Sequence, residues 1–227
     1  GPTGLKIRCT IDGSAPTASS PTADNGILLD STASVSCAAF DEAGHSGPIA
    51  TGTFFLDETP NLPVVSVTVD PGSMFDPDTG IHSMGPNATS EMPYFGANFW
   101  HDKELPVNVE LFESGARSFT IRSGLGMFGN WSRSAAKKAF TIQMREKYGQ
   151  THLNWPLFPE HPSVRKFKGF GLRANGSNFT TDYVRDAMMS SFSEGRNIEY
   201  QYSRYVLLYL NGKYWGIYQI REKLDPD

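Results

Sequence analysis

The chain has 227 residues, a formal net charge of −4 at pH 7 and 39% hydrophobic residues, so it is long enough to bury a substantial core in one large domain or two small ones. No apolar run approaches the ~20 residues of a membrane-spanning helix, and the N-terminus lacks the basic and apolar regions of a signal peptide. We therefore expect a soluble globular chain without a membrane span; because Gly1 is not a natural start, an export signal is compatible with a longer parent.

Residues 1–58 predict a small β-sandwich. The short β runs LKIRCTI, SVSCAAF and ATGTFFL are separated by segments rich in Gly, Pro, Ser, Asp and Asn. Strand alternation puts Cys9 on the face of Ile7 and Ile11, and Cys37 on the face of Val35. This pattern is compatible with a disulfide, which would imply an oxidising compartment, and equally with two buried free thiols.

Residues 59–227 predict a second domain, which gives an α+β chain overall. Two prolines in ETPNLP mark residues 58–63 as the linker, and VVSVTV opens the new sheet. Further strands are LPVNVELF, SFTIRS, 139–144, FKGFGLR, YVLLYL and YWGIYQI, the last two joined by Asn211-Gly212-Lys213, a strong hairpin signal. One main helix is expected from Thr180-Thr181-Asp182 to about Glu194, packed on the sheet through Tyr183, Ala187, Met188 and Ser191.

The segment 70–98 has little periodicity. Asp76, Asp78 and Gly80 resemble the first half of a calcium loop, but no Glu stands at the required distance, so a proline-aspartate turn is favoured. His82 and His101 have no partner at metal-ligand spacing, and we expect structural roles for both. The sequence therefore predicts no metal site.

Residues 119–144 carry the chemistry on which the chain is centred. They predict a strand at 119–122, a loop with Gly124, Gly126 and Gly129, and a strand at 139–144 that begins beside Lys138. Glycines let backbone N–H groups approach an anion, and a lysine adds a point charge. No helix follows the glycines, which argues against a dinucleotide fold, and the order of strand, glycine loop, strand and lysine is typical of kinase-type folds.

Charge also favours an anionic ligand. Residues 114–173 contain eleven basic and two acidic residues, a local charge of +9 in an acidic chain. The alternative is a solvated basic face that balances acidic neighbours. Nucleic acid is not the expected partner, because Phe128, Trp131 and Phe140 are not accompanied by any nucleic-acid motif.

Several segments in the first domain resemble a known module. IRCTIDGSAPTASSP, the stretch around SVSCAAFD and ATGTFF are similar to the immunoglobulin-like module at the C-terminus of chitobiase and hexosaminidase enzymes. Cys9 departs from the aromatic residue usual at its position, and the resemblance begins inside the module, as if it were cut off at its N-terminus. Such modules mostly serve as spacers in extracellular enzymes, which implies a secreted or cell-surface location.

Residues 62–227 resemble the spore coat protein H (CotH) family of bacterial proteins. The resemblance rests on LPVVSVTVDPGSMFDPDTGI, GNWSRSAAKKAF, EKYGQ with LNWPLFP, FKGFGLRANGSN, YVRDAMM and, most specifically, NGKYWGIYQIREKLD. CotH is an atypical kinase family with a divergent protein-kinase-like fold. The resemblance therefore implies a kinase-N-lobe-like antiparallel sheet with ATP and magnesium as cofactors of the full-length parent.

The resemblance and the glycine loop together indicate ten candidate nucleotide-phosphate-binding residues: Arg122, Gly124, Gly126, Gly129, Ser132, Arg133, Lys138, Arg173, Asp186 and Glu222. The family's L-R-N-x-G-x-N segment falls on 172–178, with Asn175, Gly176 and Asn178, and Glu222 ends the last strand where a kinase hinge would begin. We hypothesise that Lys138 pairs with Asp186 as the lysine and helix acid of this fold. The alternative has Lys138 solvated and Asp186 paired with Arg122 or Arg173.

In the family, the metal-binding and catalytic aspartates lie downstream of the position of Asp227. We therefore expect no catalytic residue in this chain, no phosphoryl transfer, and weak or no nucleotide binding. The protein substrate of the parent is not indicated. A second hypothesis is a non-catalytic surface binding module or adhesin whose basic face recognises an anionic glycan, another polysaccharide or a cell-surface protein.

Overall fold

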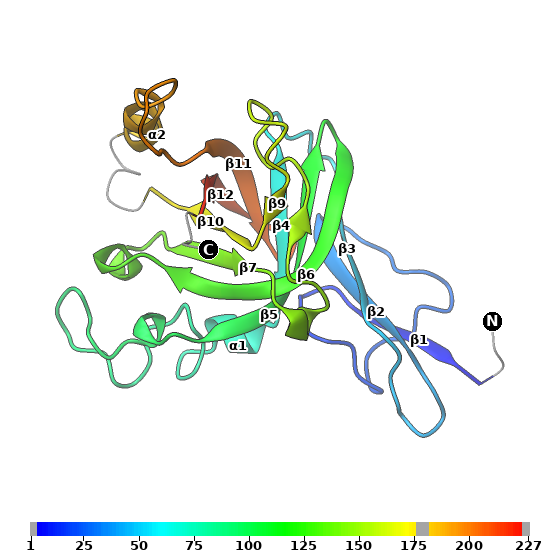
Figure 1. Cartoon of the computed structure of the whole chain (residues 1–227). Helices are drawn as coiled ribbons and strands as arrows, with labels where there is room; N and C mark the ends of the chain where they lie inside the picture. Colours follow the sequence, from blue (N-terminus) through cyan, green and yellow to red (C-terminus); the bar gives the residue numbers. More distant parts are fainter. Residues whose placement is uncertain (1–3, 176–181, 224–227) are drawn as a thin grey trace.

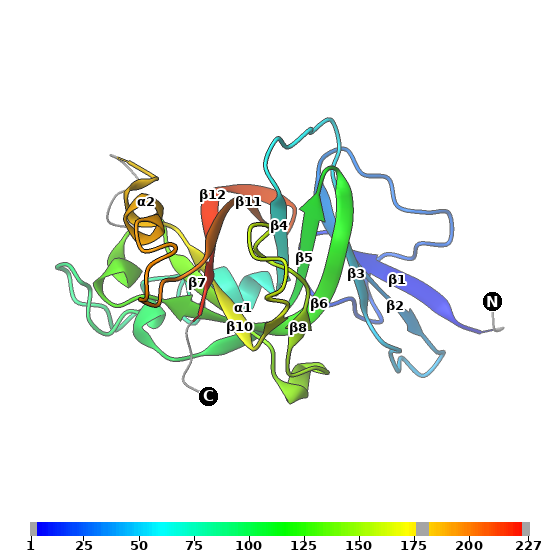
Figure 2. The same ribbon diagram turned by 45° about the horizontal axis from the view of Figure 1, so that its top comes forward.

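The computed structural model of the chain describes residues 4–175 and 182–223. It contains a three-stranded sheet, a closed seven-stranded barrel and a two-stranded sheet (Figure 1). The three-stranded sheet extends from one side of the barrel, and helix α2 lies on the opposite side in both views (Figures 1 and 2). The strand-rich architecture with few helices agrees with the expected α+β class.

The N-terminal unit is one antiparallel sheet of β1 (Lys6–Thr10), β2 (Ala33–Phe40) and β3 (Ala50–Phe54). The expected sandwich is therefore not formed within the described residues, which provide a single sheet. Part of this sheet packs against the barrel, where Ser34 and Thr53 are buried, whereas Ile7 on β1 remains 51% exposed. Burial against the barrel thus takes the place of a second sheet.

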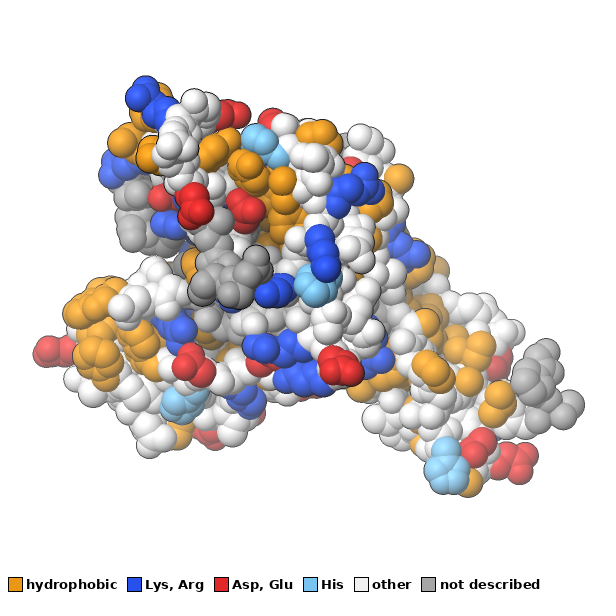
Figure 3. Space-filling view, in the orientation of Figure 1, with side chains coloured by type: hydrophobic (Ala, Val, Ile, Leu, Met, Phe, Trp, Pro, Cys, Tyr) orange, Lys and Arg blue, Asp and Glu red, His pale blue; other side chains and the backbone are white. Residues whose placement is uncertain are grey.

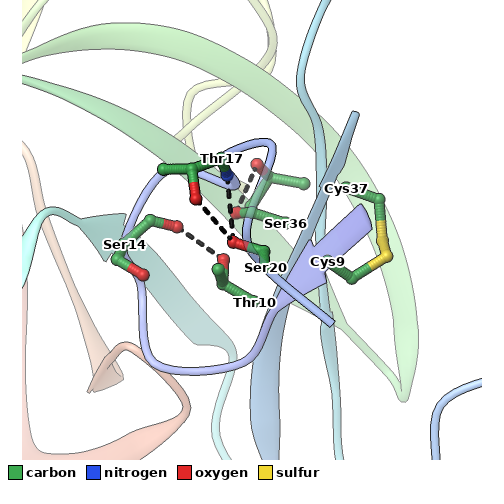
Figure 4. The surroundings of a disulfide bond; sticks show 8 residues. Cys9, Thr10, Ser14, Thr17, Ser20, Ser36 and Cys37 are labelled. Atoms are coloured by element: carbon green, nitrogen blue, oxygen red, sulfur yellow. Dashed lines mark hydrogen bonds between the residues drawn. A yellow bond between two sulfur atoms is a disulfide. The ribbon is translucent and has the colours of Figure 1, made fainter. Parts of the chain in front are cut away.

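A disulfide joins the first two strands (Figure 4). Cys9 and Cys37 are directly opposite each other in the β1–β2 register, and their sulfur atoms are bonded at 2.04 Å. Of the two alternatives that the sequence left open, the structure has the disulfide. A cross-link between residues 28 apart restricts the unfolded chain, which is worth about 3–4 kcal/mol in the chain-entropy model.

The barrel has the strand order β10-β12-β11-β4-β5-β6-β7 and closes through β10 and β7. Its strands are β4 (Val64–Val69), β5 (Glu104–Glu113), β6 (Ala116–Phe128), β7 (Ala139–Gln143), β10 (Gly169–Arg173), β11 (Ser203–Leu210) and β12 (Lys213–Glu222). All neighbours are antiparallel except β4 and β11, which run parallel. The expected open antiparallel sheet is therefore a closed barrel with one parallel pair, because the second domain's first strand pairs with a late one.

Two segments cover the ends of the barrel. At one end lie α1 (Pro71–Phe75) and η1 (Asn98–Trp100), which bury Met74 and Phe99 in the core cluster. At the other end lie β8 (Leu153–Asn154) and β9 (Lys166–Phe167), with Leu157 and Phe158 fully buried. The short helix η3 (Glu146–Tyr148) lies outside the barrel, where Lys147 and Tyr148 contact Glu104 of β5. The expected proline-aspartate turn is confirmed, since the Asp76 carboxylate accepts the N–H groups of Asp78 and Thr79.

Helix α2 (Arg185–Ser191) is shorter than expected and has no fully buried residue. Its half-buried residues include Asp186, Ala187 and Ser190, whereas Met188 is 48% exposed, so the predicted packing face was rotated by about one residue. The predicted cap residues Thr180 and Thr181 lie outside the described residues.

The Asn211-Gly212 hairpin is confirmed, with φ values of 51° and 77° that match the left-handed conformations of a tight hairpin turn.

Candidate functional site

The predicted glycine loop is mostly strand. Gly124 and Gly126 lie within β6, paired with Gln143 and Thr141 of β7. A Cβ atom on Gly124 would come within 2.4 Å of the Glu104 side chain, so a larger residue there would displace that side chain from its contacts with Arg145 and Lys147. The prediction that these two glycines form an anion-binding loop was wrong, because a strand continuous to Phe128 uses their N–H groups in the ladder.

The true loop between β6 and β7 contains Gly129 and η2 (Trp131–Ser134). Gly129 has φ of 99°, and a Cβ atom there would lie 2.2 Å from the Ser132 hydroxyl. The Arg133 guanidinium donates to the Gly129 carbonyl at 2.7 Å and lies 3.4 Å from Asp102. These three predicted site residues are therefore adjacent, and the arginine holds the loop together.

Lys138 is buried and has partners within this loop. Its side chain is 6% exposed, and its Nζ donates to the carbonyls of Arg133 at 2.8 Å and Ala135 at 2.9 Å. It also lies 4.0 Å from the centroid of the Phe99 ring. Burial lowers the pKa of Lys138 to about 8. The lysine is thus neither solvated nor presented to a ligand.

Asp186 pairs with arginines from two barrel strands. Its carboxylate lies 2.5 Å from Arg221 of β12 and 3.4 Å from Arg173 of β10. The hypothesised pair of Lys138 and Asp186 is therefore not formed, and the alternative was right about Arg173. The physical reason is position: strand cations beneath α2 reach its carboxylate, whereas Lys138 points into the β6–β7 loop.

Arg221 was not predicted, although the sequence contained a signal for it. Strand alternation in YWGIYQIRE places Tyr218 and Ile220 in the core, so Gln219 and Arg221 face outward. The β10–β12 register pairs Gln219 with Arg173 and thereby brings the two arginines to one outer face. The sequence could show this alternation, but not which helix would cover that face.

The cluster of Arg173, Asp186, Gln219 and Arg221 has unused hydrogen-bonding capacity. Arg221 is 4% exposed, and its Nη1 has no hydrogen-bond partner within the described structure. Gln219 Oε1 and Asn175 Oδ1 are also buried and have no hydrogen-bond partner within the described structure. Gly176 and Asn178 of the predicted segment lie outside the described residues. A buried guanidinium with an unpaired N–H group is chemically suited to an oxygen-rich anion.

The backbone carbonyl of Tyr183 ties the start of α2 to this face. It accepts from Asn175 Nδ2 at 2.7 Å, from the Tyr205 hydroxyl at 2.8 Å and from Gln219 Nε2 at 3.3 Å. Lys137 adds a further contact, 3.2 Å from the Tyr183 hydroxyl, and burial lowers its pKa to about 8. These bonds, from β11, from β12 and from the segments just after β10 and just before β7, fix the start of the helix that carries Asp186.

Two other predicted site residues lie away from the cluster. Glu222 ends β12 at the end of the barrel opposite Lys138, where it accepts from the Tyr202 N–H at 3.3 Å and where burial raises its pKa. Arg122 lies on the outer face of β6, in a groove between the barrel and the N-terminal sheet. The ten predicted residues therefore do not form one site.

The basic window of the sequence is likewise divided. Arg145 and Lys147 both pair with Glu104, at 2.8 and 2.9 Å. Arg145 also lines a pocket with Lys168 and Lys223, beside the ends of β7 and β10. Figure 3 shows Lys and Arg side chains gathered across the middle of this face, below the lobe that carries α2.

The chemistry of the cluster fits a phosphate group and does not fit a magnesium ion. Two guanidinium groups supply donors for anionic oxygens. The carboxylate of Asp186 is already engaged by both arginines, and no group of three His, Cys, Asp or Glu side chains within residues 4–175 and 182–223 has metal-ligand geometry. The cluster is therefore suited to an anionic group and not to a divalent metal ion.

The fold and the cluster define a β-barrel lobe with an external helix, preceded by a disulfide-linked β module. A family model described as CotH kinase protein matches residues 125–227, and one described as chitobiase/beta-hexosaminidase C-terminal domain matches residues 1–51. The two family resemblances predicted from the sequence are thus confirmed over these residues. None of the curated proteins compared with the chain matches it.

The CotH match contains every member of the cluster and begins within β6. It favours the kinase-related hypothesis over the non-catalytic binding module. In the part of the chain that the structure describes, neither helix has the length and apolar content needed to cross a membrane.

Proposed function

We propose that this chain is the phosphate-binding lobe of a CotH-like kinase and that the cluster of Arg173, Asp186 and Arg221 contacts the nucleotide phosphates. The observation that carries the proposal is the helix carboxylate held between two strand cations, one of them buried with an unpaired N–H group. In protein kinases, a strand lysine paired with a helix glutamate serves this purpose. Here arginines from β10 and β12 take the role of the strand cation paired with the helix acid, for which the sequence had indicated Lys138.

The proposal places the barrel in the role of a kinase N-lobe. The acid of α2 fixes the guanidinium planes before ligand arrives, which lowers the entropy lost on binding. Because the only carboxylate of the cluster, that of Asp186, is engaged by two arginines and not free for magnesium, we expect weak nucleotide binding, in the millimolar range, and no phosphoryl transfer by this chain. ATP with magnesium would be the cofactor of the longer parent.

An extracellular or cell-surface location is part of the proposal. The disulfide between Cys9 and Cys37 supports an oxidising compartment, since such cross-links are rare in the cytosol. The match to the chitobiase-type module supports the same location.

The site is tested by titrating the protein with magnesium-ATP and with inorganic tripolyphosphate while the NMR chemical shifts of the protein are recorded. We expect weak binding that Arg173→Gln reduces at least fivefold, because one charge-assisted contact is lost. Arg173 is the better variant because Arg221 is buried and its loss could unfold the protein. Arg165→Gln, at an exposed arginine beside β9 and outside the barrel, is the matched control.

The proposal would be contradicted by binding that survives Arg173→Gln but disappears in a folded Lys138→Met protein. Absence of any shift at millimolar ligand would also count against it. Incorporation of labelled phosphate from magnesium-ATP into the purified chain would contradict the expected inactivity.

A further inference from the structure

A cavity of about 110 Å³ lies between the C-terminal half of α2 and the segment that leads into β11. Ser190 and Glu194 line it from the side of the helix, and Tyr200 and Tyr202 line it from the opposite side. The Ser190 hydroxyl also lies 3.2 Å from Arg221, so the cavity adjoins the arginine cluster. Its volume is well below that of a drug-sized site, which suits one small chemical group.

Aromatic rings form much of the wall of this cavity. The rings of Tyr200 and Tyr202 are nearly perpendicular, at 86°, with their centroids 5.3 Å apart. The His161 ring stacks on Tyr202 at 3.8 Å and lies at 71° to Tyr200. Phe158 contacts Tyr202 at 5.7 Å and also lines the cavity. Several aromatic rings around one small hollow are the arrangement with which proteins bind organic ammonium ions.

The carboxylates of the wall favour the same charge. Glu160 and Glu194 line the cavity, whereas no lysine or arginine of the described residues does. Glu194 lies 4.0 Å from His161, and the Tyr200 hydroxyl lies 3.3 Å from the same ring nitrogen. Desolvation, followed by the negative charge of Glu194, raises the pKa of Tyr200. The wall therefore attracts a cation and repels phosphate, in contrast to the neighbouring arginine cluster.

We propose that this cavity binds an alkylammonium group, such as the trimethylammonium group of choline or the ammonium group of a lysine side chain. The rings of Tyr200, Tyr202 and His161 would attract the cation, and Glu160 and Glu194 would complement its charge. A neutral group of the same shape would gain only the apolar contacts. The proposal does not depend on nucleotide binding, because the arginines of the phosphate site do not line this cavity.

The proposal is tested by titrating the whole chain with choline, with Nα-acetyl-lysine amide and with the neutral alcohol in which a tert-butyl group replaces the trimethylammonium group of choline. NMR chemical shifts of the protein and of the ligand report binding. We expect at least one of the two cations to bind in the millimolar range, and the neutral alcohol to bind about fivefold more weakly or not at all. Preference for choline would identify a quaternary ammonium group as the natural ligand, and preference for the lysine derivative a protein side chain.

Two variants of the wall separate the ring from the charge. Tyr200→Leu keeps an apolar side chain without a ring and should weaken cation binding about two- to tenfold. Glu194→Gln keeps the shape of an exposed side chain and should weaken it about twofold, an effect that high salt should remove. Glu91→Gln, at an exposed carboxylate on the loop before η1, is the matched control and should leave binding unchanged.

Arg173→Gln should retain cation binding, so failure of the phosphate proposal would be visible separately from failure of this one. Three results would overturn the proposal: no binding of either cation at millimolar concentration, equal binding of the neutral alcohol, or cation binding that both Tyr200→Leu and Glu194→Gln leave unchanged.

Discussion

At the scale of single residues, burial decides the chemistry of several titratable groups. His82 lies among Phe75, Phe140 and Trp215, and its Nε2 is buried without a hydrogen-bond partner within the described residues. Burial, with a smaller contribution from the charge of Lys138, lowers the pKa of His82 to about 4. The sequence correctly predicted a structural role for this histidine, because no metal-ligand partner stood near it.

This buried histidine predicts a loss of stability in mild acid. An unfolded chain protonates His82 at about pH 6.5, whereas the folded chain does so only near pH 4. The folded state therefore binds fewer protons in this window, and the free energy of unfolding should fall by about 2–3 kcal/mol as pH drops from 6.5 to 4. Urea denaturation at several pH values measures the fall.

His82→Phe should flatten the pH dependence, because it removes the titrating group while keeping a ring in the aromatic cluster. His101→Phe, at an exposed histidine, is the matched control and should keep the wild-type slope. Equal slopes in both variants and the wild type would show that His82 does not titrate as described.

At the scale of elements, close contact between strands explains a glycine inside a strand. Gly169 of β10 faces β7, and a Cβ atom there would lie 2.6 Å from the Ile142 carbonyl oxygen. At Gly171, two residues along the same strand, the nearest atom would be Arg221 Cβ at 3.6 Å, an ordinary contact. The two positions lie on the same strand but differ in the room that they leave for a Cβ atom.

We predict that Gly169→Ala destabilises the barrel and that Gly171→Ala does not. The first variant forces backbone apart, which should lower the free energy of unfolding by about 1–3 kcal/mol. The second meets a side chain at normal distance and should change it by less than about 0.5 kcal/mol. Chemical denaturation of both proteins provides the comparison, and equal effects would refute the contact argument.

At the scale of the whole molecule, a buried polar junction unites the sheet and the barrel. Glu110 of β5 is fully buried, and its carboxylate accepts the Thr53 N–H and hydroxyl, both at 2.8 Å. Arg117 binds the other carboxylate oxygen at 2.9 Å. Because these bonds satisfy groups from both units, we expect the two to unfold as one cooperative body.

Glu110→Ala tests this junction. Its loss leaves the Thr53 N–H and the Arg117 guanidinium without their acceptor, which should lower the free energy of unfolding by about 3 kcal/mol. Calorimetry should show one transition for the wild type and a separate, earlier transition of the sheet in the variant. Glu91→Ala, at an exposed loop position, should retain the wild-type profile. Two transitions in the wild type would contradict the cooperative account.

The sequence by itself determined the strands, the Asn211-Gly212 hairpin and the two family resemblances. These features depend on alternation, turn chemistry and short motifs, which are local along the chain. Only the tertiary structure decided that the sheet closes into a barrel and that Asp186 pairs with Arg173 and Arg221. It also decided that the Lys138 ammonium group donates to backbone carbonyls of the β6–β7 loop. Such pairings join residues far apart in sequence, and their choice depends on register and packing that no local pattern specifies.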